Sequence, residues 1–423
     1  MSSAQSQLNA VFGQTAPGPL PDLNDGKYPY DLMYRLVNFA AYFNMFAVSQ
    51  PTFNSAIKDS SHCGHVIGFQ VHDALHRFEV NLQPATLQAG VTALNSTGQL
   101  AGKLSHRLML IPDDFVASPF RQPPPTPLDI SRSQRFAMYD GTIEFGDGKD
   151  GFRGFGTGRT YPVVTSGRPQ LLVGASGEML EGFGALAPLH GTYVLSGELS
   201  LEHGFQGNVH CRLMDPDFRI FTLDASEIPP LQAEKGPDLG LTYIVFGGKK
   251  PGKDSPTSYI LGSDGQPQGV TLNQELRNVE FKFTPEGPKG VRAFFFPHEV
   301  IGKMSANVFF NVLAPGVAGL SLTPISSTAA LEFAFTDAQG QTVATITAEG
   351  GEGKIFHDTF SAAPGSAGWR FGTFQTLAKG TGRLAGAEGI LTEISIASVA
   401  PYVTMAVYTL CLNDPEGKYR AAL

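Results

Sequence analysis

The chain of 423 residues is 42% hydrophobic and 16% charged, and its formal net charge is −8. This length is too great for one ordinary core and predicts two domains of about 150–200 residues each, while the composition excludes an intrinsically disordered protein. The sequence has no Lys- or Arg-rich run, which argues against nucleic acid and acidic membrane surfaces as partners.

The cysteines and the apolar segments indicate a soluble, cytoplasmic protein. Cys63, Cys211 and Cys411 are odd in number and far apart, so no disulfide framework is expected and a reducing compartment fits. The first residues lack the basic stretch and apolar core of a signal peptide, and no run reaches the roughly 18 apolar residues of a membrane span.

The N-terminal part predicts an arm followed by a helix. Residues 1–28 are polar and rich in proline, which is typical of an arm. Residues 30–47 predict a helix, because apolar residues recur at spacings of three and four: Leu32, Leu36, Phe39, Phe43 and Phe46. This helix is expected to pack on a sheet or close the end of a barrel. The alternative, a helix lying in a membrane surface, requires a basic face that the segment lacks.

Four of the ten histidines lie close together in the sequence, beside a cysteine. The candidates for a metal site are His62, Cys63, His65 and His72. The segment after them alternates like a strand, no second cysteine is near, and no His-Glu-x-x-His pattern occurs. Histidines at the surface or in hydrogen bonds are therefore the commoner explanation, and no metal is expected.

Short strands with Gly- and Pro-rich turns are predicted over most of the remaining chain. Residues 226–240 contain Pro229-Pro230 and many polar residues, which predicts a linker. It separates a first domain, residues 29–225, from a second domain, residues 241–423. A second helix is predicted over residues 299–313.

A Gly-x-Gly-x-x-Gly match at Gly146–Gly151 does not indicate dinucleotide binding. Glycines and aromatic residues follow it, in place of a helix whose N-terminus would hold the pyrophosphate. No cofactor is expected.

Four landmarks recur in the same order in the two halves, which predicts an internal duplication. Gly156-Thr-Gly-Arg159 matches Gly380-Thr-Gly-Arg383, and Gly174–Glu181 matches Gly386–Glu393. Ala187-Pro188 followed by TYVLSGEL matches Ala400-Pro401 followed by AVYTLCL, and Asp215–Arg219 matches Asp414–Arg420.

The run GTGRLAGAEGILTE, within Gly380–Arg420, resembles the Gly-Thr-Gly strand–turn–strand of the allene-oxide-cyclase and dirigent-like barrels. In the first copy Arg159-Thr-Tyr-Pro162 departs from that pattern, and extra residues are inserted. The resemblance implies small antiparallel barrels with a central apolar cavity. The expected fold class is therefore mainly β, with two tandem antiparallel barrels and one or two accessory helices. The motif is structural and implies a fold more than a reaction.

Glu393 is the first candidate catalytic residue. Alternation over residues 390–397 puts the isoleucines on one face of a strand and Glu393 on the other. If the isoleucine face packs outside a barrel, Glu393 points into its cavity, where burial would raise its pKa and suit it to acid or base chemistry. The commoner alternative is a glutamate that faces solvent.

Five further residues are candidates for binding a carboxylate or transferring protons: Asp140, Glu144, Arg159, Tyr161 and His357. Residues of these types more often form salt bridges or core hydrogen bonds. Since Arg159 and Tyr161 lie beside a longer loop in the first copy, the active cavity is expected in the N-terminal half.

The principal functional hypothesis is a cofactor-free cyclase, isomerase or lyase. It would act on an apolar small molecule in a barrel cavity, by positioning and acid–base catalysis. The alternatives are a non-catalytic carrier of a hydrophobic ligand and a metal-dependent enzyme built on the histidine-rich segment. The sequence leaves the substrate and a homo-oligomeric state open.

Overall fold

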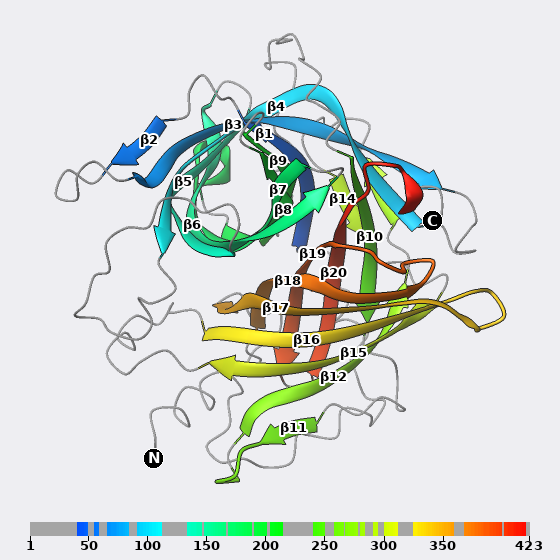
Figure 1. The fold of residues 1–423 in the computed structure, drawn as a ribbon. Coiled ribbons are helices and arrows are strands. Elements are labelled where there is room, and N and C mark those ends of the chain that lie inside the picture. Colours follow the sequence, from blue (N-terminus) through cyan, green and yellow to red (C-terminus); the bar gives the residue numbers. More distant parts are fainter. Residues whose placement is uncertain are drawn as a thin grey trace.

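The structure, a computed structural model, describes residues 40–49, 55–58, 66–83, 91–111, 133–145, 148–165, 168–187, 190–200, 204–214, 240–249, 258–265, 267–277, 280–283, 291–294, 300–311, 325–358, 368–399 and 402–419. These residues are almost entirely strand, which confirms the mainly β fold class (Figure 1). Within these ranges, no helix has the length and apolar character that crossing a membrane requires.

Strands β1 to β9 are Ala40–Ser49, Ser55–Lys58, Val66–Gln83, Val91–Ile111, Gln134–Phe145, Asp150–Thr165, Arg168–Phe183, His190–Ser200 and Gly204–Met214. Eight of them form a closed antiparallel barrel. Pairing runs from β3 through β4, β5, β6, β7 and β8 to β9, and β1 pairs with both β9 and β3 to close the ring. The short strand β2 pairs with β3 at its side.

Strands β10 to β20 are Leu241–Lys249, Ser258–Leu261, Pro267–Arg277, Glu280–Phe283, Val291–Phe294, Val300–Asn311, Ile325–Thr336, Thr342–Asp358, Gly368–Gly382, Gly389–Val399 and Tyr402–Asn413. Pairing runs from β12 through β15, β16, β17, β18 and β19 to β20, which pairs with β10. Three residue pairs between β10 and β12 join the two ends into a second barrel. Strands β13 and β14 form a separate two-stranded sheet.

The two barrels have the same strand order. In each, the first strand pairs with the last, and a four-residue strand, β2 or β11, pairs with the next long strand. Under this correspondence β6 matches β17, so Gly156-Thr-Gly-Arg159 in β6 corresponds to Gly351-Glu-Gly-Lys354 in β17. Gly380-Thr-Gly-Arg383 lies instead at the end of β18. The first pair of sequence landmarks therefore occupies different places in the fold.

The predicted helix over residues 30–47 is wrong where the structure describes it, because Ala40–Ser49 is strand β1. Pairing with β9 on one side and β3 on the other satisfies its backbone, and its aromatic residues suit a strand. The predicted helix over 299–313 is also wrong, because Val300–Asn311 is strand β15. There, buried Met304 and Ala306 alternate with exposed Lys303 and Ser305, a period of two.

The predicted strand–turn–strand at Gly380 is confirmed as the β18–β19 hairpin. Gly382 and Gly386 have φ of 57° and 75°, a conformation that favours glycine. The turn also places Leu384 and Ala387 in the core of the second barrel.

Three apolar cores hold the molecule together. One fills the first barrel, with members such as Phe136, Met138 and Val209, and a second fills the second barrel around Phe246 and Phe333. The third joins the barrels and brings together Leu172, Val194, Tyr243, Val245, Phe374, Ile390, Ile394 and Val407. Figure 1 shows the two barrels packed one above the other.

Candidate functional site

Glu393 lies on the inner face of the second barrel. On β19, Ile390 and Ile394 pack in the core between the barrels, whereas Leu391 packs in the core of the second barrel. Because side chains alternate along a strand, Glu393 shares the inner face with Leu391. The isoleucine face thus packs outside the second barrel. This is the condition under which the strand pattern predicts that Glu393 points inward.

Polar residues surround Glu393 at its level of the barrel. Thr373 on β18 and Tyr408 on β20 pair with it from the two sides. The Thr373 Oγ1 donates to Glu393 Oε2 over 3.4 Å, and the Tyr408 hydroxyl donates to Gln274 Oε1 over 2.9 Å. Thr373 and Tyr408 are buried, whereas Glu393 as a residue keeps partial exposure.

The environment of Glu393 favours its neutral form. Burial raises the pKa of its carboxyl group, and hydrogen bonds from Ser395 and Thr373 oppose this in part. A carboxyl group with a raised pKa holds a proton closer to neutral pH than an ordinary glutamate does. It is therefore suited to give and to take a proton in one reaction cycle.

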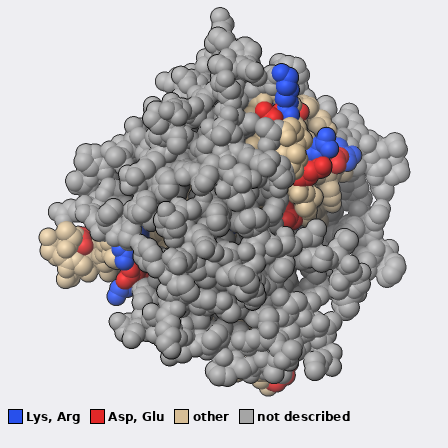
Figure 2. All heavy atoms as spheres, turned by 180° about the vertical axis from the view of Figure 1, so that it is seen from behind, with Lys and Arg blue, Asp and Glu red and all other residues tan. Residues whose placement is uncertain are grey.

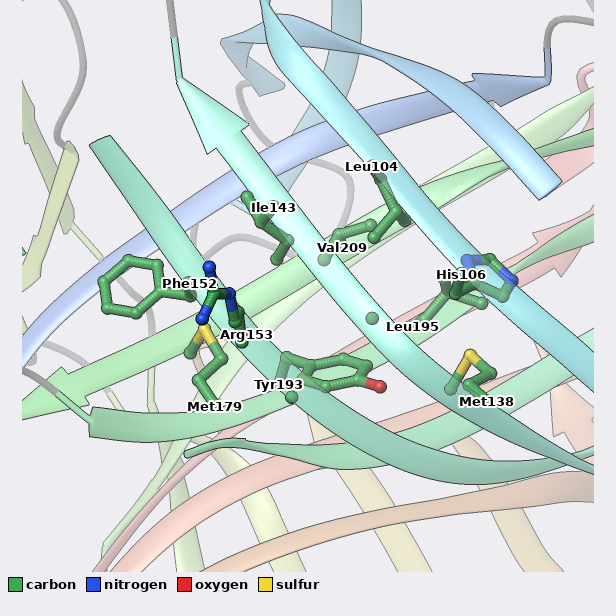
Figure 3. A pocket seen from close by; sticks show the side chains of 12 residues that line it. Leu104, His106, Met138, Ile143, Phe152, Arg153, Met179, Tyr193, Leu195 and Val209 are labelled. Atoms are coloured by element: carbon green, nitrogen blue, oxygen red, sulfur yellow. The ribbon is translucent and has the colours of Figure 1, made fainter. Parts of the chain in front are cut away.

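The interior of the first barrel is closely packed around a small cavity. A cavity of about 20 Å³ lies there, space for about one water molecule. Figure 3 shows His106 and Tyr193 among its apolar walls, which include Met138 and Leu195. Burial, followed by the charge of His72, lowers the pKa of His106 to about 4, so this imidazole is neutral at neutral pH. A molecule of substrate size does not fit here unless side chains move.

Arg159 and Tyr161 lie at the contact between the barrels. The Tyr161 hydroxyl donates to the carbonyl oxygen of Gly350 on β17, over 3.1 Å. Arg159 Nη2 is 3.8 Å from Glu352 Oε1, and Arg135 Nε is 2.6 Å from the same oxygen. Burial raises the pKa of Tyr161, and the nearby Arg159 opposes this. These two candidates face the second barrel rather than the interior of the first.

Asp140 and Glu144 lie on the outside of the first barrel. Asp140 is exposed, has a φ of 50° at a bulge in β5, and forms an ion pair with Arg107. Glu144 alternates with the core residues Ile143 and Phe145, which places it on the outer face. On the face shown in Figure 2, described basic side chains lie next to acidic ones.

The other candidates are only partly described. His357 lies on β17, where its backbone pairs with Trp369 of β18. His62, Cys63 and His65 lie outside the described residues, and His72 has its Nδ1 3.0 Å from Ser105 Oγ. Among the described residues, no group of three His, Cys, Asp or Glu side chains is placed to hold a metal ion.

The structure therefore does not gather the candidates into one site. It places Glu393 inside one barrel, Arg159 and Tyr161 between barrels, and Asp140 and Glu144 outside.

Sequence reasoning missed the polar neighbours of Glu393. Thr373 and Gln375 alternate with the interface residue Phe374 along β18, so the same period of two that identified Glu393 contained the signal. Gln274 and Tyr408 lie more than a hundred residues apart, and only ring closure brings them together.

Comparison of the chain with protein-family models, with curated proteins and with solved structures finds no match in any of the three.

Proposed function

We propose that the chain binds a small apolar molecule inside its second barrel, and that Glu393 transfers a proton to and from it. The reaction class is a cofactor-free cyclisation, isomerisation or lyase elimination. The observation that carries the proposal is the position of Glu393, a partly exposed residue with a raised pKa, on the inner face of a barrel among buried neighbours.

The small cavity of the first barrel argues against that barrel as the site, and the environment of Glu393 supports the second. The cavity around His106 has space for about one water, and the pKa of about 4 keeps that imidazole in its neutral form at neutral pH, so it is not an imidazolium acid. The raised pKa of Glu393 favours a group that is both acid and base. The hydrogen bond from Thr373 holds the carboxyl group in one orientation.

The test begins with the purified protein, because the substrate is unidentified. Native mass spectrometry detects any apolar molecule that co-purifies, and that molecule is then offered to fresh protein and followed by mass-spectrometric analysis of products. We expect conversion by the natural chain and a loss of roughly 10²- to 10⁴-fold in Glu393→Gln, with binding retained.

Glu388→Gln is the matched control, since Glu388 is exposed in the turn just before β19. It should leave conversion unchanged. Equal turnover in Glu393→Gln and the natural chain would exclude the catalytic role.

A carrier of a hydrophobic ligand is the second candidate. The observation that favours it is the hydrogen bond from the Tyr408 hydroxyl to Gln274 Oε1. Because these polar groups bond to each other, this part of the barrel wall suits the binding of an apolar molecule without a reaction. Under this alternative the bound molecule is released unchanged. Stoichiometric zinc or iron in the same spectra would instead favour the histidine-rich metal enzyme, and the intact mass would report a homo-oligomer. The cytoplasmic location is a prediction that cell fractionation would test.

A further inference from the structure

Glu198 is a fully buried carboxyl group at the joint between the barrels. It lies on β8 and has 0% exposure. Because side chains alternate along a strand, it is on the same face as Val194, which packs in the joining core, and on the opposite face from Leu195, which packs inside the first barrel. Neither carboxyl oxygen has a hydrogen-bond partner among the described residues. A carboxylate in such a place is costly, because nothing replaces the water that it loses.

The groups facing Glu198 come from both barrels. Leu172 on β7 and Gln206 on β9 lie directly opposite it in the sheet, and neither titrates. From the second barrel come Tyr243 on β10 and Cys411 on β20, whose pKa values are raised first by burial and further by the charge of Glu198. Strands β18 and β19 also pack against β8, and their residues in the joining core, Phe374, Ile390 and Ile394, do not titrate.

Among the described residues, the nearest basic side chains on the same face of this sheet are farther along β9. His210 and Arg212 pair with Val194 and Thr192, two and three levels from Glu198. At about 6.7 Å per level this is about 13 Å and about 20 Å along the strand. Both are themselves buried. Among the described side chains, Glu198 thus faces neutral or potentially negative groups, and its ionisation would add a charge that none of them compensates.

We propose that Glu198 is a proton-binding latch between the two barrels. The carboxyl group is neutral while the barrels are packed, and its ionisation loosens the contact of β8 with the second barrel.

The direction of the pH dependence follows from linkage. Burial raises the pKa of Glu198 from 4.5 to about 7. A raised pKa in the packed state means that its stabilisation is fully present below about 4.5 and is lost as the pH rises through about 7. If opening restores the ordinary pKa, the opening equilibrium should rise on the order of fifty-fold between about pH 5 and pH 8.

Two buried thiols make the opening measurable in the full chain. Cys411 lies in the joining core near Tyr243, whereas Cys211 lies in the core of the first barrel. In a Cys63→Ser background, alkylation of Cys411 reports opening of the joint, and alkylation of Cys211 reports unfolding of the barrel. At each pH, the alkylation rate of a thiol in the natural chain is divided by its rate in Glu198→Gln. This ratio removes the effect of pH on the reactivity of the thiol itself.

We expect Cys411 to react about a hundredfold or more faster when Glu198 is present than in the Glu198→Gln variant at pH 8.5, and this ratio to fall more than tenfold by pH 5.5. Cys211 should show no such ratio. Glu388→Gln, an exposed change, should behave as the natural chain does.

A Cys411 ratio independent of pH, or a Cys211 ratio that rises in parallel, would overturn the proposal. If Glu198→Gln fails to fold, Glu198→Met replaces it, since an apolar side chain suits the same place. In that case the free energy of unfolding in urea is measured against pH. It must increase towards acid pH more in the natural chain than in Glu198→Met.

Discussion

Two glutamates of this chain show how position sets the chemistry of one residue type. Glu393 and Glu198 both have a raised pKa because of burial. Glu393 receives hydrogen bonds and keeps partial exposure, which supports the proposed exchange of its proton with a ligand. Glu198 has no exposed surface and no hydrogen-bond partner among the described residues, and under the proposed latch its proton is exchanged only when the barrels part.

The hydrogen bond from Thr373 should lower the pKa of Glu393. Thr373→Val removes a donor to the charged form and should therefore raise that pKa further. The measurement is a pH titration of carboxyl resonances by carbon-13 NMR, with Glu393→Gln to assign the signal.

Thr345→Val, on the partly exposed outside of β17, is the matched control and should leave the Glu393 resonance unmoved. A Glu393 pKa equal in Thr373→Val and the natural chain would show that the hydrogen bond is too weak to matter.

At the scale of the element, the contact of β18 with β7 and β8 depends on two glycines at corresponding places in the two barrels, Gly174 on β7 and Gly372 on β18. A Cβ on Gly174 would lie 2.7 Å from Phe374 Cδ2, and a Cβ on Gly372 would lie 2.8 Å from Thr192 Cγ2. Each glycine thus lets the opposite barrel approach closely, and the corresponding faces of the two barrels meet, as in a contact between two copies.

Alanine at either glycine should weaken the joint. We expect Gly174→Ala and Gly372→Ala to lower the free energy of unfolding by about 1–3 kcal/mol each through overpacking, measured by urea denaturation. Gly265→Ala is the comparator, since no atom lies within 4 Å and only its φ of +73° opposes the change, at about 1 kcal/mol. An unfolding free energy unchanged in both joint variants would contradict the overpacking.

The aromatic cluster in the core of the second barrel should contribute strongly to the free energy of unfolding. Phe333 has 0% exposure, and its ring lies edge-on to Phe246 and Tyr408, with centroids 5.6 Å and 5.2 Å away. Phe333→Ala should cost about 3–5 kcal/mol of unfolding free energy in chemical denaturation. Phe309→Ala, at 41% exposure in the same barrel, should cost much less. Equal losses would mean that the cluster does not organise the core.

At the scale of the molecule, three charges tie the barrels together. Glu352 on β17 of the second barrel lies between Arg135 and Arg159 of the first, all partly buried. Together with the joining core, this contact should make the two barrels unfold in one transition.

Reversing the central charge should separate the barrels. Glu352→Lys places three cations together, so we expect its calorimetric transition to broaden or split, with recovery as salt screens the repulsion. Glu349→Lys, an exposed change on the same strand, should keep one transition. A single unshifted transition in Glu352→Lys would show that the ion pairs contribute nothing to the joint.

The strands were largely readable from local pattern. The alternation in Gly389–Val399, the glycines of the preceding turn and the short runs between turns predict strands that the structure confirms. The segment at Val300–Asn311 carried the same alternation, and a helical interpretation overlooked it. For Ala40–Ser49 no local pattern distinguishes helix from strand, because its aromatic residues fit both a helical period and a period of two. Pairing with β9 and β3 selects the strand.

The sequence by itself determined that this protein is built of strands, in two units, because alternation and turn residues are local properties of the chain. Only the tertiary structure decided which face of each strand is inside, since alternation defines two faces without ranking them. That choice buries Glu393 within a barrel and Glu198 between barrels, and it directs Arg159 and Tyr161 to the joint. Ring closure and barrel packing join residues far apart in the chain, and these contacts set the chemistry of each carboxyl group.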